Sequence, residues 1–337
     1  MRALVITAPG RAEVQEVPAP TPGPGEVVVD VDRAGICGTD IEIFHGEMAY
    51  LRSGHARFPM RIGHEWTGIV ASVGAGTDTG WIGRRVMGDT MLGCGSCRRC
   101  RRGNQHVCAE RHELGIRGGR PGALAEQAAV PASSLHELPR ALDPAVGAMV
   151  EPAGNALRAV EGAQLAAGDR VLILGPGTIG LLCALLARDA GAEVHLLGVT
   201  EESMGFAREL GFEHMWTEQT LPELPVDAVI DAATSAELPA RALQLVEPGG
   251  RVVYIGLASS PSQIDTRELV LGDLTAVGVL SASPGLPGAI AAFTSGNVDP
   301  RPLVAATTGL DEVAEVLAGT RPTGAGPAPK IHIDPRR

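Results

Sequence analysis

The sequence predicts an α/β protein of two domains, a mostly antiparallel, barrel-like β domain followed by a doubly wound parallel sheet. Three observations support this prediction: the length of 337 residues, a change in hydrophobic pattern near residue 152, and a glycine-rich turn directly after an apolar strand. A chain of this length is typical of two domains of ordinary size. The two sides of residue 152 are therefore considered separately.

Residues 1–152 contain short strand-like runs separated by Gly and Pro. The clearest runs are EVVVDV and GIVASVG, at residues 26–31 and 68–74. Short β-rich runs between turn residues favour an antiparallel sandwich or barrel. We therefore expect residues 1–152 to form the antiparallel domain.

Residues 153–285 show a different pattern, in which apolar strand-like runs alternate with helical stretches. The runs are RVLILG, AEVHLL, VDAVIDA, RVVYIG and LTAVGVL, and helical patterns over 178–190 and 201–210 follow the first two. This alternation is typical of a parallel sheet with helices on both faces. In residues 286–337 we expect a helix at LDEVAEVLAG and a strand at KIHID, with the segment returning to the first domain.

The composition excludes several kinds of partner. The formal net charge is −11, with 45% hydrophobic and 20% charged residues, which is the mix of a soluble globular protein. A net negative charge disfavours binding to nucleic acid or to an anionic membrane surface. The sequence contains neither an apolar run of about 18 residues nor the layout of a signal peptide at MRALVITAPG. We expect a cytoplasmic protein with a small-molecule partner and neither a nucleic-acid nor a membrane partner.

The strongest local motif is CGSCRRCRRGNQHVC, which contains four closely spaced cysteines: Cys94, Cys97, Cys100 and Cys108. Four thiolates can complete a tetrahedral zinc shell, which indicates a structural rather than a catalytic site. In a reducing cytosol such a cluster favours a metal over disulfides, and the arginines between the ligands favour thiolate over thiol. An iron–sulfur cluster, which also takes four thiolates, is the alternative.

The glycine-rich turn is GPGTIG, which directly follows the strand RVLIL and opens a helix. This context is the one that a dinucleotide-binding Rossmann domain requires. Gly175 permits a tight turn, Gly177 lets the backbone approach a pyrophosphate, and Gly180 permits close helix–strand packing. Thr178 and Ile179 begin the helix whose free N–H groups would face the phosphates. The motif therefore predicts an NAD or NADP site.

Five motifs occur in one order along the chain: GICGTD, GHEWTG, the four-cysteine segment, VEPAGNALRAV and GPGTIG. This series resembles the zinc-containing medium-chain dehydrogenases, a family that includes alcohol, sorbitol, threonine and glucose dehydrogenases. The resemblance covers nearly the whole chain. It implies a GroES-like catalytic domain with a structural-zinc lobe at about residues 90–110, a second, catalytic zinc, and a homodimer or homotetramer. It also implies hydride transfer between NAD(P) and an alcohol or ketone.

The resemblance also implies a set of catalytic residues. Cys37 and His64 match the first two zinc ligands of the family. A catalytic zinc needs about three protein ligands and one open position, and the third ligand is either Glu65 or Glu151, which stands where alcohol dehydrogenases have a second cysteine. Thr39 matches the hydroxyl that bonds the substrate oxygen and passes on its proton, and the neighbouring Asp40 has either a structural or a functional role.

Departures from the alcohol dehydrogenases favour a polyhydroxylated substrate. Many of those enzymes have His five residues after the metal-binding Cys, where this chain has Glu42. The segment CGTDIEIFHG is more similar to the glucose dehydrogenases, so we expect a sugar, polyol or cyclitol. Glu113 resembles a sugar-contacting glutamate of that branch, with a surface salt bridge as the alternative. His45 and Trp66 are candidates for the pocket lining, with packing favoured for Trp66.

The end of the second strand of the parallel sheet bears on the choice of cofactor. NAD-binding members have an acidic residue there for the ribose hydroxyls, whereas this chain has Gly198. Without that carboxylate, the backbone N–H of Gly198 and the hydroxyl of Thr200 could meet a 2′-phosphate. Arg208 follows one to two turns later, whereas Glu201 and Glu202 would oppose the phosphate. We therefore expect NADP to be preferred, with dual use of NAD as the alternative.

Other functions fit parts of this pattern. Dehydrogenases of simple alcohols or amino alcohols, and epimerases that oxidise and re-reduce the substrate on a retained cofactor, could share the same motifs. A zinc-free, quinone-reductase-like enzyme and a non-enzymatic binding protein are disfavoured, because the metal-ligand residues and the glycine-rich turn are all present.

Overall fold

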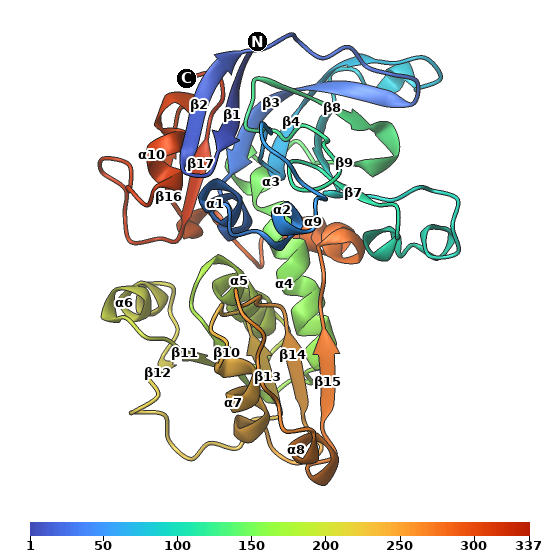
Figure 1. The fold of residues 1–337 in the computed structure, drawn as a ribbon. Coiled ribbons are helices and arrows are strands. Elements are labelled where there is room, and N and C mark those ends of the chain that lie inside the picture. Colours follow the sequence, from blue (N-terminus) through green and yellow to red (C-terminus); the bar gives the residue numbers. More distant parts are fainter. The chain divides into compact units, whose positions relative to one another are not determined.

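The computed structural model describes residues 1–337, which divide into two compact units (Figure 1). The β unit comprises Met1–Glu151, Val304–Gly326 and Lys330–Arg337, and the α/β unit comprises Pro152–Leu303 and Pro327–Pro329. The first segment of the β unit thus ends at Glu151, next to residue 152, where the hydrophobic pattern of the sequence changes. Residues 286–303, which were expected to return to the first domain, belong instead to the α/β unit.

The β unit is built around a mostly antiparallel sheet of seven strands. The path runs β16-β17-β3-β4-β5-β9, and β8 also pairs with β3. The strands are β3 (Glu26–Gly35), β4 (Glu65–Val73), β5 (Arg85–Gly88), β8 (Gln127–Pro131), β9 (Leu135–Glu137), β16 (Val304–Thr308) and β17 (Lys330–Ile333). Alternating apolar side chains of β3, such as Val27, Val29 and Val31, are fully buried in its core. Only the pairing of β16 with β17 is parallel.

Shorter elements complete the β unit. Two two-stranded antiparallel sheets pair β1 with β2 and β6 with β7. These strands and the α-helices of the unit are β1 (Arg2–Ala8), β2 (Arg11–Glu16), β6 (Met91–Leu92), β7 (His112–Glu113), α1 (Gly38–His45), α2 (Ala49–Arg52), α3 (Pro144–Ala148) and α10 (Val313–Leu317). The helix expected at LDEVAEVLAG forms as a 3₁₀ turn, Leu310–Glu312, that continues into α10.

The α/β unit contains a six-stranded parallel sheet in the order β12-β11-β10-β13-β14-β15 (Figure 1). Its strands are β10 (Arg170–Leu174), β11 (Glu193–Leu197), β12 (His214–Trp216), β13 (Ala228–Asp231), β14 (Arg251–Tyr254) and β15 (Thr275–Gly278). Successive strands are added on one side of β10 as far as β12 and then on its other side from β13 onward, which is the strand order of the Rossmann fold. Ligands of such sheets bind at the carboxyl ends of the strands where the order changes side, between β10 and β13.

Helices follow the strands of the α/β unit as the alternating pattern predicts. They are α5 (Thr178–Asp189), α6 (Glu201–Glu209), α7 (Leu238–Leu245), α8 (Thr266–Leu271) and α9 (Leu286–Ser295), and α4 (Val150–Ala163) runs across the division between the units. Helix α9 packs closely on α4. A Cβ atom on Gly285 would overlap Gly154 O, and a Cβ atom on Gly288 would overlap the Leu157 side chain. This packing explains why α9 belongs to the α/β unit.

Several strands have no counterpart among the runs expected from the sequence, namely β1, β2, β5 to β9, β12 and β16. Strand β12 has only three residues at the edge of its sheet, and β16 pairs in parallel with β17 at the edge of the other. The three residues of β12 are too few for an alternating pattern to identify, and the five residues of β16, VAATT, do not alternate between apolar and polar. None of the helices combines the length and the apolar character that crossing a bilayer requires.

Candidate functional site

Cys37, His64 and Glu65 come together in the β unit. Strands β3 and β4 pair antiparallel, with Gly35 opposite Glu65, so the end of one strand and the beginning of the other lie side by side. Cys37 caps the N-terminus of α1, two residues beyond β3. The three ligand atoms lie within 4.8 Å of one another. A thiolate, an imidazole and a carboxylate at this spacing form a donor set that suits zinc.

Asp40 connects the two segments that carry these ligands. Its carboxylate is completely buried and accepts hydrogen bonds from the backbone N–H groups of Cys37 (2.9 Å) and Gly63 (3.3 Å). Asp40 Oδ1 also lies 3.6 Å from His64 Nδ1. Burial by itself would lower the pKa of His64, but the neighbouring Asp40 carboxylate and Cys37 together outweigh burial and raise that pKa. The structure therefore shows a structural role for Asp40 in holding the ligand segments together.

Glu65 has a partner that its sequence motif does not predict. Lys330 Nζ donates to Glu65 Oε1 (2.9 Å) and Oε2 (2.6 Å), and both side chains are buried. Burial would lower the pKa of Lys330, but the Glu65 carboxylate raises it above the ordinary value. The pair joins β4 to β17, from the C-terminal segment of the chain.

The remaining predicted catalytic residues lie on two helices. Thr39 is partly buried in the first turn of α1, and Glu42 is half-buried one turn later. Burial, with a contribution from Glu47, raises the pKa of Glu42. Glu151 is buried in the first turn of α4, outside the group of three residues whose ligand atoms lie within 4.8 Å.

Glu113 is engaged in a buried ion pair. Its Oε1 accepts hydrogen bonds from Arg111 Nε (2.8 Å) and the Tyr50 hydroxyl (3.0 Å). Glu113 therefore forms a salt bridge, as the alternative predicted, but a buried one and not one on the surface. Trp66 is completely buried in the core of the β unit, so its role is packing, whereas His45 is exposed at the end of α1.

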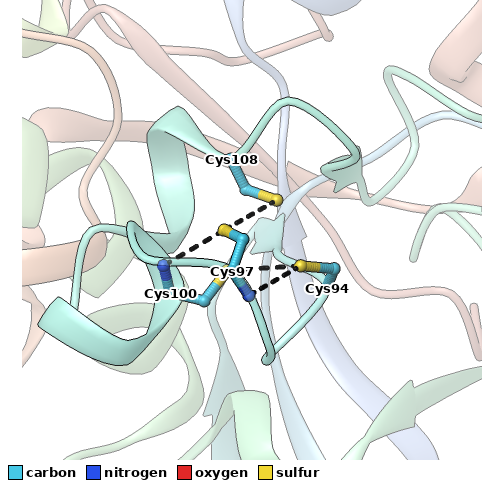
Figure 2. A group of neighbouring side chains, drawn as sticks. All are labelled: Cys94, Cys97, Cys100 and Cys108. Atoms are coloured by element: carbon cyan, nitrogen blue, oxygen red, sulfur yellow. Dashed lines mark hydrogen bonds between the residues drawn. The ribbon is translucent and has the colours of Figure 1, made fainter.

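The four predicted lobe cysteines gather between β6 and β7 with their sulfur atoms facing one another (Figure 2). Cys94 Sγ lies 3.9 Å from Cys100 Sγ, and Cys97 Sγ lies 3.8 Å from Cys108 Sγ. These distances exceed a disulfide bond, but they equal the edge of a tetrahedron with zinc–sulfur bonds of about 2.3 Å. The geometry therefore fits a metal with four thiolate ligands.

Hydrogen bonds from the lobe favour the thiolate form of Cys94 and Cys97, whereas burial raises the pKa of Cys100 to about 12. The Cys97 N–H donates to Cys94 Sγ (3.4 Å), and the Cys100 N–H donates to Cys97 Sγ (3.5 Å). Hydrogen bonds from Ser96, followed by that from the Cys97 N–H, lower the pKa of Cys94 to about 6. A thiolate is the form that binds zinc.

The glycine-rich turn of the α/β unit has the expected local geometry. Gly175 has a φ of +91°, in the left-handed region, and a Cβ atom on Gly180 would overlap Gly175 O. By contrast, a Cβ atom on Gly177 would meet nothing within 4 Å. Gly177 caps α5 without a side-chain hydrogen bond, so the N–H groups that begin with Thr178 and Ile179 lack a side-chain acceptor at the cap. This end of α5 suits an anionic group.

The segment after β11 is organised differently from the expectation. The Gly198 N–H donates to Trp216 O (3.0 Å), so this donor is committed to β12 instead of being free for a phosphate. Thr200 caps α6, and its hydroxyl accepts the Ser203 N–H (3.2 Å). Among the neighbouring charged side chains, Arg208 forms an ion pair with Glu201, with 3.7 Å between Arg208 Nη1 and Glu201 Oε2. The side chain of Glu202 is exposed.

Each of the two units contains a region that matches a known protein family. Residues 23–140 match the family model described as alcohol dehydrogenase GroES-like domain, and residues 178–295 match the one described as zinc-binding dehydrogenase. The chain is 36% identical over 291 residues to an L-threonine 3-dehydrogenase of Saccharopolyspora erythraea, covering 83% of each chain. It is 32% identical over 317 residues to a 2-dehydro-3-deoxy-L-galactonate 5-dehydrogenase of Pseudoalteromonas atlantica, covering 90% of this chain and 91% of the relative.

Solved structures extend the similarity to the whole chain. A zinc-binding dehydrogenase from Sinorhizobium meliloti 1021 bound to NADP is 30% identical, with a TM-score of 0.89 and 99% of each chain covered. An alcohol dehydrogenase from E. coli CFT073 complexed with NADH is 27% identical, with the same TM-score and the same coverage. Both nicotinamide cofactors therefore occur among the similar structures.

Proposed function

This chain belongs to the zinc-dependent medium-chain dehydrogenases and is an NAD(P)-dependent alcohol or polyol dehydrogenase, and from this premise we propose that its substrate carries a secondary hydroxyl on a sugar, polyol or cyclitol. The reverse reaction reduces the corresponding ketone. The observation that supports the chemistry best is the cluster of Cys37, His64 and Glu65, whose ligand atoms lie within 4.8 Å of one another.

Two metal sites follow from the donor sets. Cys37 and His64, with Glu65 or Glu151 as the third ligand, would hold a catalytic zinc, and the four lobe cysteines would hold a structural zinc. When bound, a catalytic zinc supplies Lewis-acid chemistry that lowers the pKa of a substrate hydroxyl. Metal-replete protein should therefore contain about two zinc ions per chain.

The chain's own residues would bind the cofactor and move the proton. The N-terminus of α5, with Gly177 open on its outer side, would bind the pyrophosphate of NADP or NAD. Thr39, two residues after Cys37, would accept the hydroxyl proton of the substrate. Glu42 lies one turn later and, with its raised pKa, is suited to take part in a proton relay.

The substrate class depends chiefly on Glu42. A half-buried carboxylate is costly to leave unpaired, and the hydroxyl groups of a polyol are suitable donors for it. Glu113 does not support a polyol substrate, since its carboxylate already accepts hydrogen bonds from Arg111 and Tyr50. The similarity to L-threonine 3-dehydrogenases favours a second candidate, the secondary hydroxyl of an amino alcohol such as threonine.

A substrate panel tests this proposal. We expect kcat/KM for the best polyol, cyclitol or sugar to exceed that for ethanol, butanol and benzyl alcohol by about 100-fold or more, because the simple alcohols leave polar groups of the site unpaired. L-Threonine belongs in the same panel, and its preference over every polyol would support the second candidate instead. Reduced cofactor must form in equal amount to product, since an epimerase would form none. If the simple alcohols were the best substrates, the polyol assignment would be wrong.

Cofactor preference provides a second test. We propose that NADP(H) is accepted at least as well as NAD(H), because Gly198 places no carboxylate beside the 2′-phosphate. Gly198→Asp should shift the NADP/NAD ratio of kcat/KM toward NAD by about tenfold or more, since like charges in a partly solvated cleft repel by roughly 1–4 kcal/mol.

Gly198→Asn is the matched control for this substitution. A Cβ atom at residue 198 would lie 3.0 Å from Pro176 Cγ and 3.2 Å from Met204 Cγ, so both variants meet the same crowding and differ only in charge. Equal shifts in the two variants, or a strong NAD preference of the unmodified enzyme, would contradict the electrostatic argument.

A further inference from the structure

Lys330 is the only lysine of the chain, since the other 27 of its 28 lysines and arginines are arginines. This single lysine is also among the least exposed polar residues, with 2% of its surface accessible. An ammonium group is strongly hydrated and is rarely buried without partners. The position of the one lysine therefore requires a specific explanation.

All three donors of the Lys330 ammonium group are occupied. They reach Glu65 Oε1 (2.9 Å), Glu65 Oε2 (2.6 Å) and the carbonyl oxygen of Ile36 (3.0 Å). An arginine would bring five donors in a planar group, for which these three acceptors are too few. The site is therefore matched to a compact cation with three donors.

These contacts reach both segments that carry the proposed zinc ligands. Ile36 directly precedes Cys37, and Glu65 directly follows His64. The Ile36 N–H also donates to Ile331 O (3.0 Å), so β17 holds this peptide segment from both sides. One side chain of β17 thus fixes the separation between the Cys37 segment and the His64 segment.

The Glu65 carboxylate is also constrained on the side that faces Gly35. A Cβ atom on Gly35 would overlap Glu65 Oε2, so the carboxylate occupies space that only glycine leaves free. Glu65 is therefore held between Gly35 and Lys330, with only 1% of its surface exposed. A carboxylate enclosed in this way has one position available while Lys330 remains in place.

We propose that Lys330 is a positioning residue of the catalytic metal site. It compensates the charge of Glu65 beside His64 and fixes the backbone that carries Cys37, so the metal-binding donors keep their spacing. This inference rests on the proposed function, because it assumes that Cys37 and His64 bind the metal. Groups that orient metal ligands commonly contribute 10- to 100-fold to metal affinity.

The test uses protein loaded with cobalt(II), whose thiolate charge-transfer absorption reports on Cys37. Lys330→Met should weaken cobalt binding at this site by about 10- to 100-fold in competition with a chelator and should shift the absorption band. In the Glu65→Gln background the same substitution should weaken cobalt binding by a clearly smaller factor, because the ion pair is already broken and only the contact with Ile36 O remains to be lost. Equal losses in the two backgrounds, or unchanged affinity with only a lower Tm, would overturn the proposal.

A second variant keeps the proposal testable if Lys330→Met does not fold. Gly35→Ala displaces the Glu65 carboxylate without altering Lys330, and we expect it to weaken cobalt binding and to shift the band. Gly38→Ala is its matched control, because a Cβ atom there would meet nothing within 4 Å although Gly38 also adjoins Cys37. Similar affinities for these two variants would contradict the proposal. A missing thiolate band in the unmodified protein would instead contradict the proposed metal site itself.

Discussion

Cys37→Ala is expected to lower kcat by about a thousandfold or more and to remove one of the two zinc ions from each chain. The physical reason is that the thiolate is one of only three ligand atoms in the cluster of Cys37, His64 and Glu65. A Lewis acid contributes several kcal/mol to the stabilisation of developing charge, and each 1.4 kcal/mol corresponds to a tenfold change in rate. Elemental analysis and steady-state kinetics on metal-replete protein measure the two effects.

The fold should survive this substitution. Cys37 is only partly buried, and the N-terminus of α1 retains the Asp40 carboxylate that accepts the N–H of residue 37. Cys183→Ala is the matched control, because Cys183 is buried in α5 and its thiol donates to Ala156 O, apart from both cysteine-containing metal clusters. That variant should keep both zinc ions and most of its activity. Full activity in Cys37→Ala, or replete protein without zinc, would show that the catalytic assignment is wrong.

Cys108→Ser should have the opposite pattern, with the structural zinc lost and the catalytic zinc retained. Cys108 is the buried member of the lobe cluster, and three thiolates cannot complete the tetrahedral shell. Because binding of a structural zinc contributes directly to folding, we expect the lobe to lose several kcal/mol of local stability. The catalytic cluster involves other residues, so the effect on kcat should be much smaller than that of Cys37→Ala.

Limited trypsin digestion measures this local loss. Arg98, Arg99, Arg101 and Arg102 are exposed between the lobe cysteines, and the folded lobe should protect the bonds after them. Cys108→Ser should be cleaved in this segment well before the rest of the chain. Ser96→Ala removes only a hydrogen bond to Cys94 Sγ and should remain protected. Iron and sulfide in the purified protein would favour the iron–sulfur alternative.

The features that could be predicted from the sequence are those encoded by neighbouring residues. The strand, turn and helix around GPGTIG follow from local hydrophobic pattern and glycine spacing, and β10 and α5 begin and end close to the expected residues. The four lobe cysteines lie within one short segment, so their spacing alone predicts a common metal. Cys37, His64 and Glu65 lie within two short motifs at the paired ends of β3 and β4.

The features that could not be predicted depend on contacts between distant segments. Lys330 is 265 positions from Glu65, and no local pattern links the two residues. The only sequence signal is that Lys330 is the single lysine. The Gly198 N–H was expected to face a phosphate, but its acceptor belongs to Trp216 on β12, a strand too short to predict. Glu113 likewise pairs with Tyr50, 63 positions away.

The single buried lysine also determines how the protein responds to amine-selective reagents. Apart from its terminal amine, the folded chain offers an acylating reagent no accessible amino group, because its exposed side-chain cations are guanidinium groups. Lys330 can react only when local or global unfolding separates it from Glu65. An acyl adduct located at Lys330, as distinct from one at the terminal amine, therefore records one opening of this strand. Its rate of appearance in peptide mass spectra reports how often the C-terminal segment releases the ligand-bearing loops.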